Sequence, residues 1–253
     1  HIALLTDFGL QDNFAGVMEG MIYRINPHVT VSHITHGIKP QDLFQASFLL
    51  RHSYKHFPEK TIFVCVVDPG VGTARDVIVV RKKATVFMAP DNGILSFLTG
   101  RDTEYFKIVP NKFIPPPAST TFHGRDIFSP LAALLSKGIS INKLARTVKS
   151  IKHLDIPSPV KGQKTVKGKI IYIDRFGNCI SNVSRDLFTA MTGSSFTVEI
   201  NNLKIYDLSS HYQIPSKAGV LFNSFNLLEI FVPNGNASQE LGITLNMPFT
   251  IKI

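Results

Sequence analysis

The chain has 253 residues, enough for one large domain or two smaller ones with a buried core. Hydrophobic residues make up 44% and charged residues 18%, which excludes a disordered chain, and no apolar run approaches the roughly 20 residues of a membrane-spanning helix. The net charge of +9 is spread over scattered Lys and Arg residues without interleaved aromatic side chains, which favours a basic solvated surface over a nucleic-acid site.

The first two thirds of the chain alternate strand and helix patterns. The apolar run 61–67 is rich in β-branched residues and is typical of a strand buried on both faces. Alternating strands and helices predict an α/β layered domain with a parallel-rich sheet over residues 1–157. We expect strands at residues 2–6, 29–34, 61–67, 76–80 and 85–88, and helices at residues 13–25, 43–57 and 127–135.

The pattern changes in the last third of the chain. Residues 158–164 continue a stretch rich in Pro and Gly, and we expect them to form a linker. The short strands beyond it, with few helix signals between them, predict an all-β barrel domain over residues 165–253. These strands are expected at residues 167–173, 195–200, 219–221, 228–232 and 249–253.

Two cysteines and the start of the chain bear on location. Cys65 and Cys179 lie inside apolar runs, which is typical of buried free thiols in a reducing compartment rather than of a disulfide. The sequence opens at His1 and shows no signal peptide. We therefore expect a cytoplasmic protein with no membrane partner.

Polar residues follow the predicted strands, where open α/β sheets place their ligands. Asp7 comes directly after the first strand and suits either a ribose diol or the N-cap of the next helix. Asp68 follows the most apolar strand, and Arg75 lies seven residues later across a glycine-containing turn. The turn lacks the patterns of a dinucleotide or triphosphate loop, so the pair is either a structural ion pair or part of a site.

His123 stands beside Gly124 at a predicted helix entrance. An Asp, an Arg and a His together can bind and polarise one water molecule, which favours a functional role for Asp68, Arg75 and His123. His33 and His36 form only a weak pair, so we predict no metal site and no cofactor.

The second domain carries a further group of turn residues. Asp174, Phe176 and Asn178 follow a predicted strand, and Ser224 lies between two others. Asn can read an adenine edge, Phe can stack on it, and Asp or Ser can hold an amine or carboxylate. The alternative is turn chemistry alone, because Asn, Asp and Gly are common turn formers.

Six short strings occur in one order along the chain. They are TDFG from Thr6, DPGVGTAR from Asp68, PDNG from Pro90, TFHGRDIF from Thr121, IDRFGN from Ile173, and NSFNLLEI with GNA between Asn223 and Ala237. Together they resemble the S-adenosylmethionine (SAM) hydroxide adenosyltransferase family, relatives of the bacterial fluorinase and chlorinase. The resemblance covers essentially the whole chain.

This resemblance implies hydrolysis of SAM to adenosine and L-methionine, with SAM as substrate and no cofactor. It implies an N-terminal α/β domain, a C-terminal β-barrel and a homotrimer in which the substrate lies between one subunit's N-terminal domain and its neighbour's C-terminal domain. Asp68, Arg75 and His123 match the residues that activate water. The implied substrate contacts are Asp7 for the ribose diol, Asp174 and Ser224 for the methionine amine and carboxylate, and Phe176, Asn178, Asn236 and Ala237 for adenine.

The halogenase branch of this family differs at several positions. It carries Tyr-Ser or Tyr-Gly in place of His123-Gly124, and a Trp over the ribose where this chain places Gln41. The sequence has no Trp and lacks the long insertion that fluorinases carry before PDNG. Phe225 follows Ser224 where the halogenases have Arg, which puts the methionine carboxylate contacts in doubt. We expect a SAM hydrolase; the alternatives are a SAM-dependent halogenase and a nucleoside- or RNA-binding module without turnover.

Overall fold

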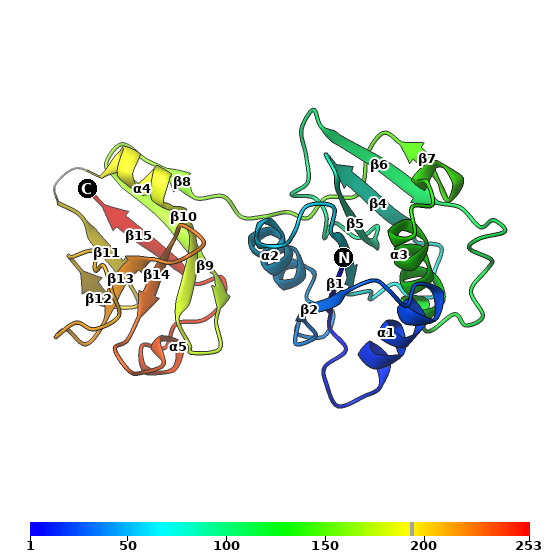
Figure 1. Ribbon diagram of the computed structural model, residues 1–253. Coiled ribbons are helices and arrows are strands. Elements are labelled where there is room, and N and C mark those ends of the chain that lie inside the picture. The colour runs from blue at the N-terminus through cyan, green and yellow to red at the C-terminus, as the bar shows by residue number, and fades with distance from the viewer. Residues whose placement is uncertain (193–194) are drawn as a thin grey trace. The chain divides into compact units, whose positions relative to one another are not determined.

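Figure 1 shows the computed structural model, which describes residues 1–192 and 195–253. The chain divides into two compact units, His1–Asp155 and Ile156–Ile253. Within the segment predicted as a linker, strand β8 (Val160–Lys161) pairs with β9 (Thr165–Ile173), so part of that segment belongs to the second unit.

The first unit is built on one mixed sheet with the strand order β2-β1-β3-β5-β4-β6-β7. Strands β2, β1, β3 and β5 are parallel, and β4, β6 and β7 continue the sheet in antiparallel pairs. The predicted α/β domain with parallel strands is confirmed, although half of the sheet is antiparallel. The strands are β1 (Ile2–Thr6), β2 (Val31–Thr35), β3 (Ile62–Val66), β4 (Val77–Lys82), β5 (Thr85–Pro90), β6 (Thr103–Ile108) and β7 (Ala145–Val148).

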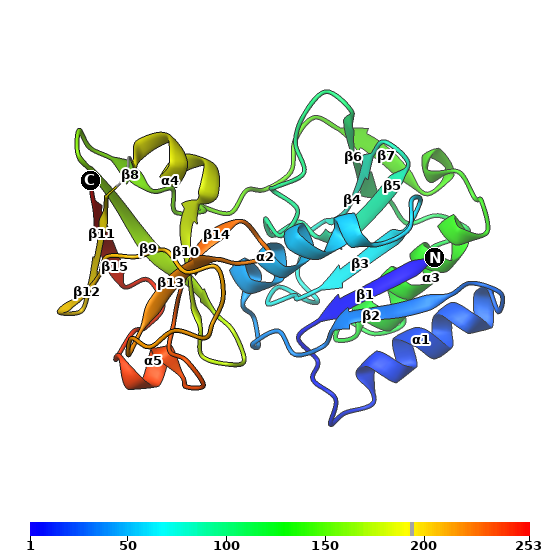
Figure 2. The same cartoon turned by 60° about the vertical axis from the view of Figure 1, so that its left-hand side comes forward.

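Helices cover both faces of this sheet (Figure 2). Successive residues of a strand point to opposite faces, so β1 and β3 contribute alternate side chains to two cores. One core contains Leu4 and Val64 with residues of α1 (Phe14–Ile25) and α3 (Ser129–Ser136). The other contains Leu5 and Cys65 with residues of α2 (Leu43–Ser53). Burial on both faces explains why β3 is apolar at every position and β1 at every position except its last residue, Thr6.

Two predicted helices differ in detail from the observed ones. The helix expected over 43–57 ends at Ser53 and is followed by a single 3₁₀ turn, Tyr54–His56. The helix expected over 127–135 begins at Ser129 and is preceded by a π-helical turn, Gly124–Phe128. This wide turn places His123 at its start, and such turns are frequent at functional sites.

The second unit is an antiparallel, nearly closed barrel with the strand order β12-β11-β15-β9-β10-β14-β13, which confirms the predicted C-terminal barrel. Its core is filled by apolar side chains that include Val166, Ile170 and Ile251, and by the buried thiol of Cys179. Cys65 and Cys179 are both free and buried, as predicted. The remaining elements are β10 (Cys179–Ser184), α4 (Arg185–Met191), β11 (Thr197–Ile200), β12 (Leu203–Ile205), β13 (Gly219–Phe222), β14 (Leu227–Phe231), α5 (Ala237–Glu240) and β15 (Pro248–Lys252).

Within residues 1–192 and 195–253, no helix has the length and apolar character needed to cross a membrane.

Candidate active site

Two carboxylates lie at one edge of the first unit's sheet. Strands β1 and β3 are parallel neighbours, with Thr6 opposite Val66. The residues that follow these strands, Asp7 and Asp68, therefore emerge at the same edge. They line one cavity of about 330 Å³, together with His123 and with Phe8, Phe14, Pro40, Gln41, Val66, Pro69, Val71, Thr121, Phe122 and Gly124.

Asp68, Arg75 and His123 form one hydrogen-bonded cluster. The Arg75 guanidinium donates from Nε to Asp68 Oδ1 at 3.0 Å, and its Nη2 donates both to Asp68 Oδ2 and, at 2.7 Å, to His123 Nδ1. The Arg75 and Asp68 side chains are only 9% and 6% exposed. The cluster is therefore a nearly buried ion pair with a histidine attached to its cation.

The contacts of His123 determine which ring nitrogen carries its hydrogen. A guanidinium can only donate, so Nδ1 accepts from Arg75 and a neutral ring carries its hydrogen on Nε2. Burial and the positive charge of Arg75 lower the pKa of His123, while Asp68 and Asp126 partly offset this effect. His123 is therefore neutral near pH 7, with an N–H available as a donor.

Two loops are held together so that Arg75 reaches His123. Gly72 has a φ of +79°, and a Cβ built on it would lie 2.6 Å from the carbonyl oxygen of Thr120, so only glycine fits this approach. The loop that contains Thr120 is in turn tied to the π-helical turn, because Ser119 N donates to Asp126 Oδ2 at 2.9 Å. Backbone packing and one side-chain bond thus set the geometry of the cluster.

Asp7 does not cap the following helix. The N-cap of α1 is Asn13, and one oxygen of Asp7 accepts from the backbone N–H of Gln41 at 2.9 Å. Of the two interpretations left open by the sequence, helix capping is therefore excluded for Asp7. A carboxylate held in this way on the cavity wall is suited to accept hydrogen bonds from a diol.

The aromatic wall of this cavity was not predicted from the sequence. The rings of Phe8, Phe14 and Phe122 contact one another, with centroids 5.2 to 6.0 Å apart. In the sequence, the wall is indicated only by two neighbouring positions: Phe8 directly follows Asp7, and Phe122 directly precedes His123. Three rings beside two carboxylates make a wall that suits a flat or cationic ligand.

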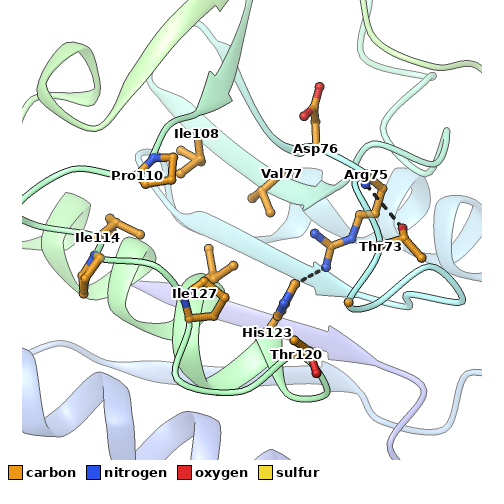
Figure 3. Close-up of a pocket in the computed structure, with 13 residues that line it drawn as sticks. Thr73, Arg75, Asp76, Val77, Ile108, Pro110, Ile114, Thr120, His123 and Ile127 are labelled. Carbon is orange, nitrogen blue, oxygen red and sulfur yellow. Dashed lines mark hydrogen bonds between the residues drawn. The ribbon is translucent and has the colours of Figure 1, made fainter.

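A second cavity of about 310 Å³ also has Arg75 and His123 in its lining. Figure 3 shows the two side chains facing each other, with Val77 and Ile127 beside them and Asp76 pointing away. The rest of this lining is mainly apolar and includes Ile108 and Ile114. His123 thus lines both cavities, whereas Arg75 lines only the second.

In the second unit, Asp174 organises a tight turn. Its Oδ1 accepts from the backbone N–H groups of Phe176 and Asn178, each at 2.9 Å, and its Oδ2 accepts from Asn178 Nδ2 at 3.1 Å. Turn chemistry, the alternative considered from the sequence, is therefore present. The ring of Phe176 is 74% exposed, so it is available for stacking.

The structure brings Asn236 and Ala237 to the same turn. The backbone N–H of Ser238 donates to the carbonyl of Gly177 at 2.9 Å. Asn236 caps α5 by accepting from Gln239 N, and its side chain packs against Gly177 so closely that a Cβ there would clash. The four residues predicted to contact adenine therefore all lie around one turn of the barrel; they are Phe176, Asn178, Asn236 and Ala237.

Ser224 lies in a different turn, between β13 and β14, and is exposed. Its neighbour Asn223 donates from Nδ2 to Glu229 Oε2 at 2.9 Å, and Tyr212 donates to Glu229 Oε1 at 2.9 Å. Glu229 is buried, which raises its pKa. This network was missed from the sequence, since an isolated Glu in an apolar strand gives no sign of its partners.

Two family models match the chain: the SAM hydroxide adenosyltransferase N-terminal domain over residues 2–145, and the C-terminal domain of the same family over residues 168–250. The chain belongs to the SAM hydroxide adenosyltransferase family. Its two units correspond to the two domains of the family.

Several relatives align over nearly the whole chain. A protein of Thermus thermophilus named (R)-S-adenosyl-L-methionine hydrolase is 31% identical over 98% of this chain and 97% of its own length. A protein of the same name from Methanocaldococcus jannaschii is 30% identical over 96% of this chain and 92% of its own. A fluorinase of an Actinoplanes species is 25% identical over 73% of this chain.

The fold also matches solved structures. The crystal structure of an uncharacterized conserved protein from Thermotoga maritima superposes with a TM-score of 0.92, at 32% identity, and covers 100% of both chains.

Proposed function

We propose that this protein hydrolyses SAM to adenosine and L-methionine. The observation that carries the proposal is the Asp68–Arg75–His123 cluster in a chain from this family, because Asp68 and His123 of this cluster line one cavity together with Asp7. The curated relatives above are named for the R epimer at sulfur, and we propose the same epimer here.

The chemistry needs little beyond a positioned water molecule. The oxygen of water attacks the ribose 5′ carbon in line with the departing sulfur, the C–S bond breaks, and its electron pair goes to the neutral thioether. One proton of the water passes to the carboxylate of Asp68 and from there to solvent. Holding nucleophile and electrophile in line contributes up to ~7–11 kcal/mol in favourable cases.

The three clustered residues take different parts in this proposal. Arg75 holds the Asp68 side chain in place by hydrogen bonds and fixes the Nδ1 face of His123. The Nε2–H of neutral His123 donates to the water oxygen and orients it, and the carboxylate of Asp68 accepts the water hydrogen. Asp68 and His123 line the same cavity, as this arrangement requires.

Binding is proposed to be divided between the two units. In the first unit, Asp7 holds the ribose diol. In the second unit, Phe176 stacks on adenine. The other proposed contacts there are Asn178, Asn236 and Ala237 for adenine, and Asp174 and Ser224 for the methionine amine and carboxylate. We further propose that the protein is a homotrimer whose sites each combine the first unit of one subunit with the second unit of its neighbour.

The decisive experiment is a turnover assay in ¹⁸O-labelled water. The purified protein is incubated with each sulfonium epimer of SAM in the presence of excess chloride, and products are separated by chromatography and weighed by mass spectrometry. We expect adenosine that carries ¹⁸O, together with unlabelled methionine, and both products should form faster from the R epimer. Accumulation of 5′-chloro-5′-deoxyadenosine would instead place the chain with the halogenases, and binding of adenosine without any product would identify a nucleoside-binding module.

A further inference from the structure

A line of hydrogen-bonding side chains connects the surface of the first unit with the base of the Asp7 loop. Glu19 of α1 faces His33 of β2, with Oε2 and Nε2 3.4 Å apart. His33 Nδ1 and His36 Nε2 are 2.7 Å apart, and His36 Nδ1 lies 2.8 Å from the hydroxyl of Thr6. Thr6 is fully buried and His36 is 5% exposed.

With both histidine rings neutral, the carboxylate at the end of this line sets its direction. A carboxylate only accepts, so His33 presents its hydrogen to Glu19 from Nε2, and in the neutral ring Nδ1 is then an acceptor. His36 must therefore donate from Nε2 to His33 and accept at Nδ1. Burial and the neighbouring His33 lower the pKa of His36, which keeps this ring neutral. The hydroxyl of Thr6 consequently donates its hydrogen to His36.

With its hydrogen committed to His36, the Thr6 oxygen is an acceptor for the chain beyond Asp7. It accepts from the backbone N–H of Phe8 at 3.2 Å, and the carbonyl of His36 accepts from the N–H of Gly9 at 2.8 Å. Asp7 is thus bracketed by one contact to the Thr6 hydroxyl, which the His36 side chain holds, and one contact to the His36 backbone carbonyl. These contacts leave the Asp7 side chain oriented to meet Gln41 N and the cavity.

We infer that His36 is a positioning residue for Asp7: through its bond to Thr6 it fixes the carboxylate that binds the ribose diol. His33 and Glu19 support it by fixing its tautomer. This inference rests on the role proposed above for Asp7, and it gives the two histidines a function other than metal binding.

The test compares two ligands that differ only in the diol. Adenosine carries both ribose hydroxyls, whereas 2′,3′-dideoxyadenosine carries neither. Their dissociation constants are measured by calorimetry for the wild type and for His36→Asn, His36→Gln and Asp7→Ala. Asn places an oxygen near the position of Nδ1 and can accept from Thr6, whereas Gln places its polar atoms near Nε2 and cannot. His56→Gln serves as a control at an exposed histidine.

We expect the wild type, His36→Asn and His56→Gln to prefer adenosine by at least about tenfold. In His36→Gln this preference should fall to within about threefold, as in Asp7→Ala, while the dideoxy compound binds all variants equally. Retention of the full preference in His36→Gln, equal weakening of both ligands, or no preference in the wild type would overturn the inference. Turnover of SAM by the wild type is measured separately, so a failure of the inference is distinguishable from a failure of the proposed activity.

Discussion

At the scale of single residues, Arg75 is the most constrained side chain of the candidate site. Its Nη2 donates to two different acceptors, Asp68 and His123, while its Nε donates to Asp68. A lysine ammonium is a single point and cannot reproduce this planar fork. The three residues therefore form one unit in which each group depends on the other two.

We predict strongly non-additive losses within this cluster. Asp68→Ala, His123→Ala and Arg75→Lys should each lower kcat by about 10²–10⁴-fold, the usual range for a positioned acid–base group. The double variant Asp68→Ala/His123→Ala should lose little more than either single variant, because removal of one member already misplaces the water.

Steady-state kinetics and calorimetric binding of SAM check this expectation. The dissociation constant should stay within about threefold of wild type, since the proposed ligand contacts lie on other residues. Variants that turn over normally would show that the cluster is only a structural ion pair.

The protonation of His123 predicts how activity depends on pH. Its pKa is lowered by burial and by Arg75, and the neutral ring is the form that accepts from Arg75. We therefore expect kcat/KM to be constant near pH 7 and to fall with acid along one limb, with an apparent pKa below the ordinary 6.5 of histidine. In His123→Gln the plateau should be lower and this limb should be absent.

The same shift has a consequence for stability. Between the folded pKa of His123 and about 6.5, the unfolded chain binds this proton more readily than the folded chain. The contribution of His123 to the free energy of unfolding should therefore decrease as pH falls through this window. Denaturant titrations of the wild type and His123→Gln at several pH values separate this contribution from those of other groups.

At the scale of elements, the sequence predicts those strands whose burial leaves a simple pattern. β1 up to Leu5 and all of β3 are apolar because both faces are covered, and the polar residues after them mark the ligand edge. β6 and β7 were missed because they are antiparallel strands with exposed polar positions, such as Glu104 and Arg146. Nothing local distinguishes such segments from loops.

As with the strands, part of the candidate site could be predicted from the sequence and part could not. Asp7, Asp68 and His123 could be singled out by their position at strand or helix ends, and they share one cavity. For Asp174 the sequence left turn bonding and ligand binding open, because a side chain that ends a strand can face either the backbone or a ligand. The Glu229 network depends on contacts between distant segments, which no local pattern encodes.

Gly72 offers a test of how the loops set the site. We predict that Gly72→Ala lowers kcat by at least about tenfold, because the added Cβ would meet the carbonyl of Thr120 and force the loop that carries Arg75 to shift. Gly70→Ala is the matched control in the same loop, since its added Cβ would have no neighbour closer than 3.4 Å. Kinetics of both variants, with melting temperatures to confirm folding, make the comparison. Equal activity of the two would contradict the proposed role of this approach.

At the scale of the whole molecule, the proposal requires contributions from two chains to each site. Asp7 belongs to the first unit and Asp174 to the second. If both serve a site within one chain, a mixture of Asp7→Ala and Asp174→Ala chains contains only defective sites. If each site combines units of neighbouring subunits, some sites of a mixed assembly receive an intact Asp7 from one chain and an intact Asp174 from the other.

We predict that co-expression of differently tagged Asp7→Ala and Asp174→Ala chains, with purification of assemblies carrying both tags, restores activity. A closed ring of three that contains both kinds of chain has one intact site out of three, so activity should approach about one third of wild type. The control pairs Asp7→Ala with Asp68→Ala. Both residues lie in the first unit, so every site still lacks one of them and activity should stay at the level of the single variants. Sedimentation of the wild type as a fully active monomer, or no recovery in the first mixture, would refute the shared site.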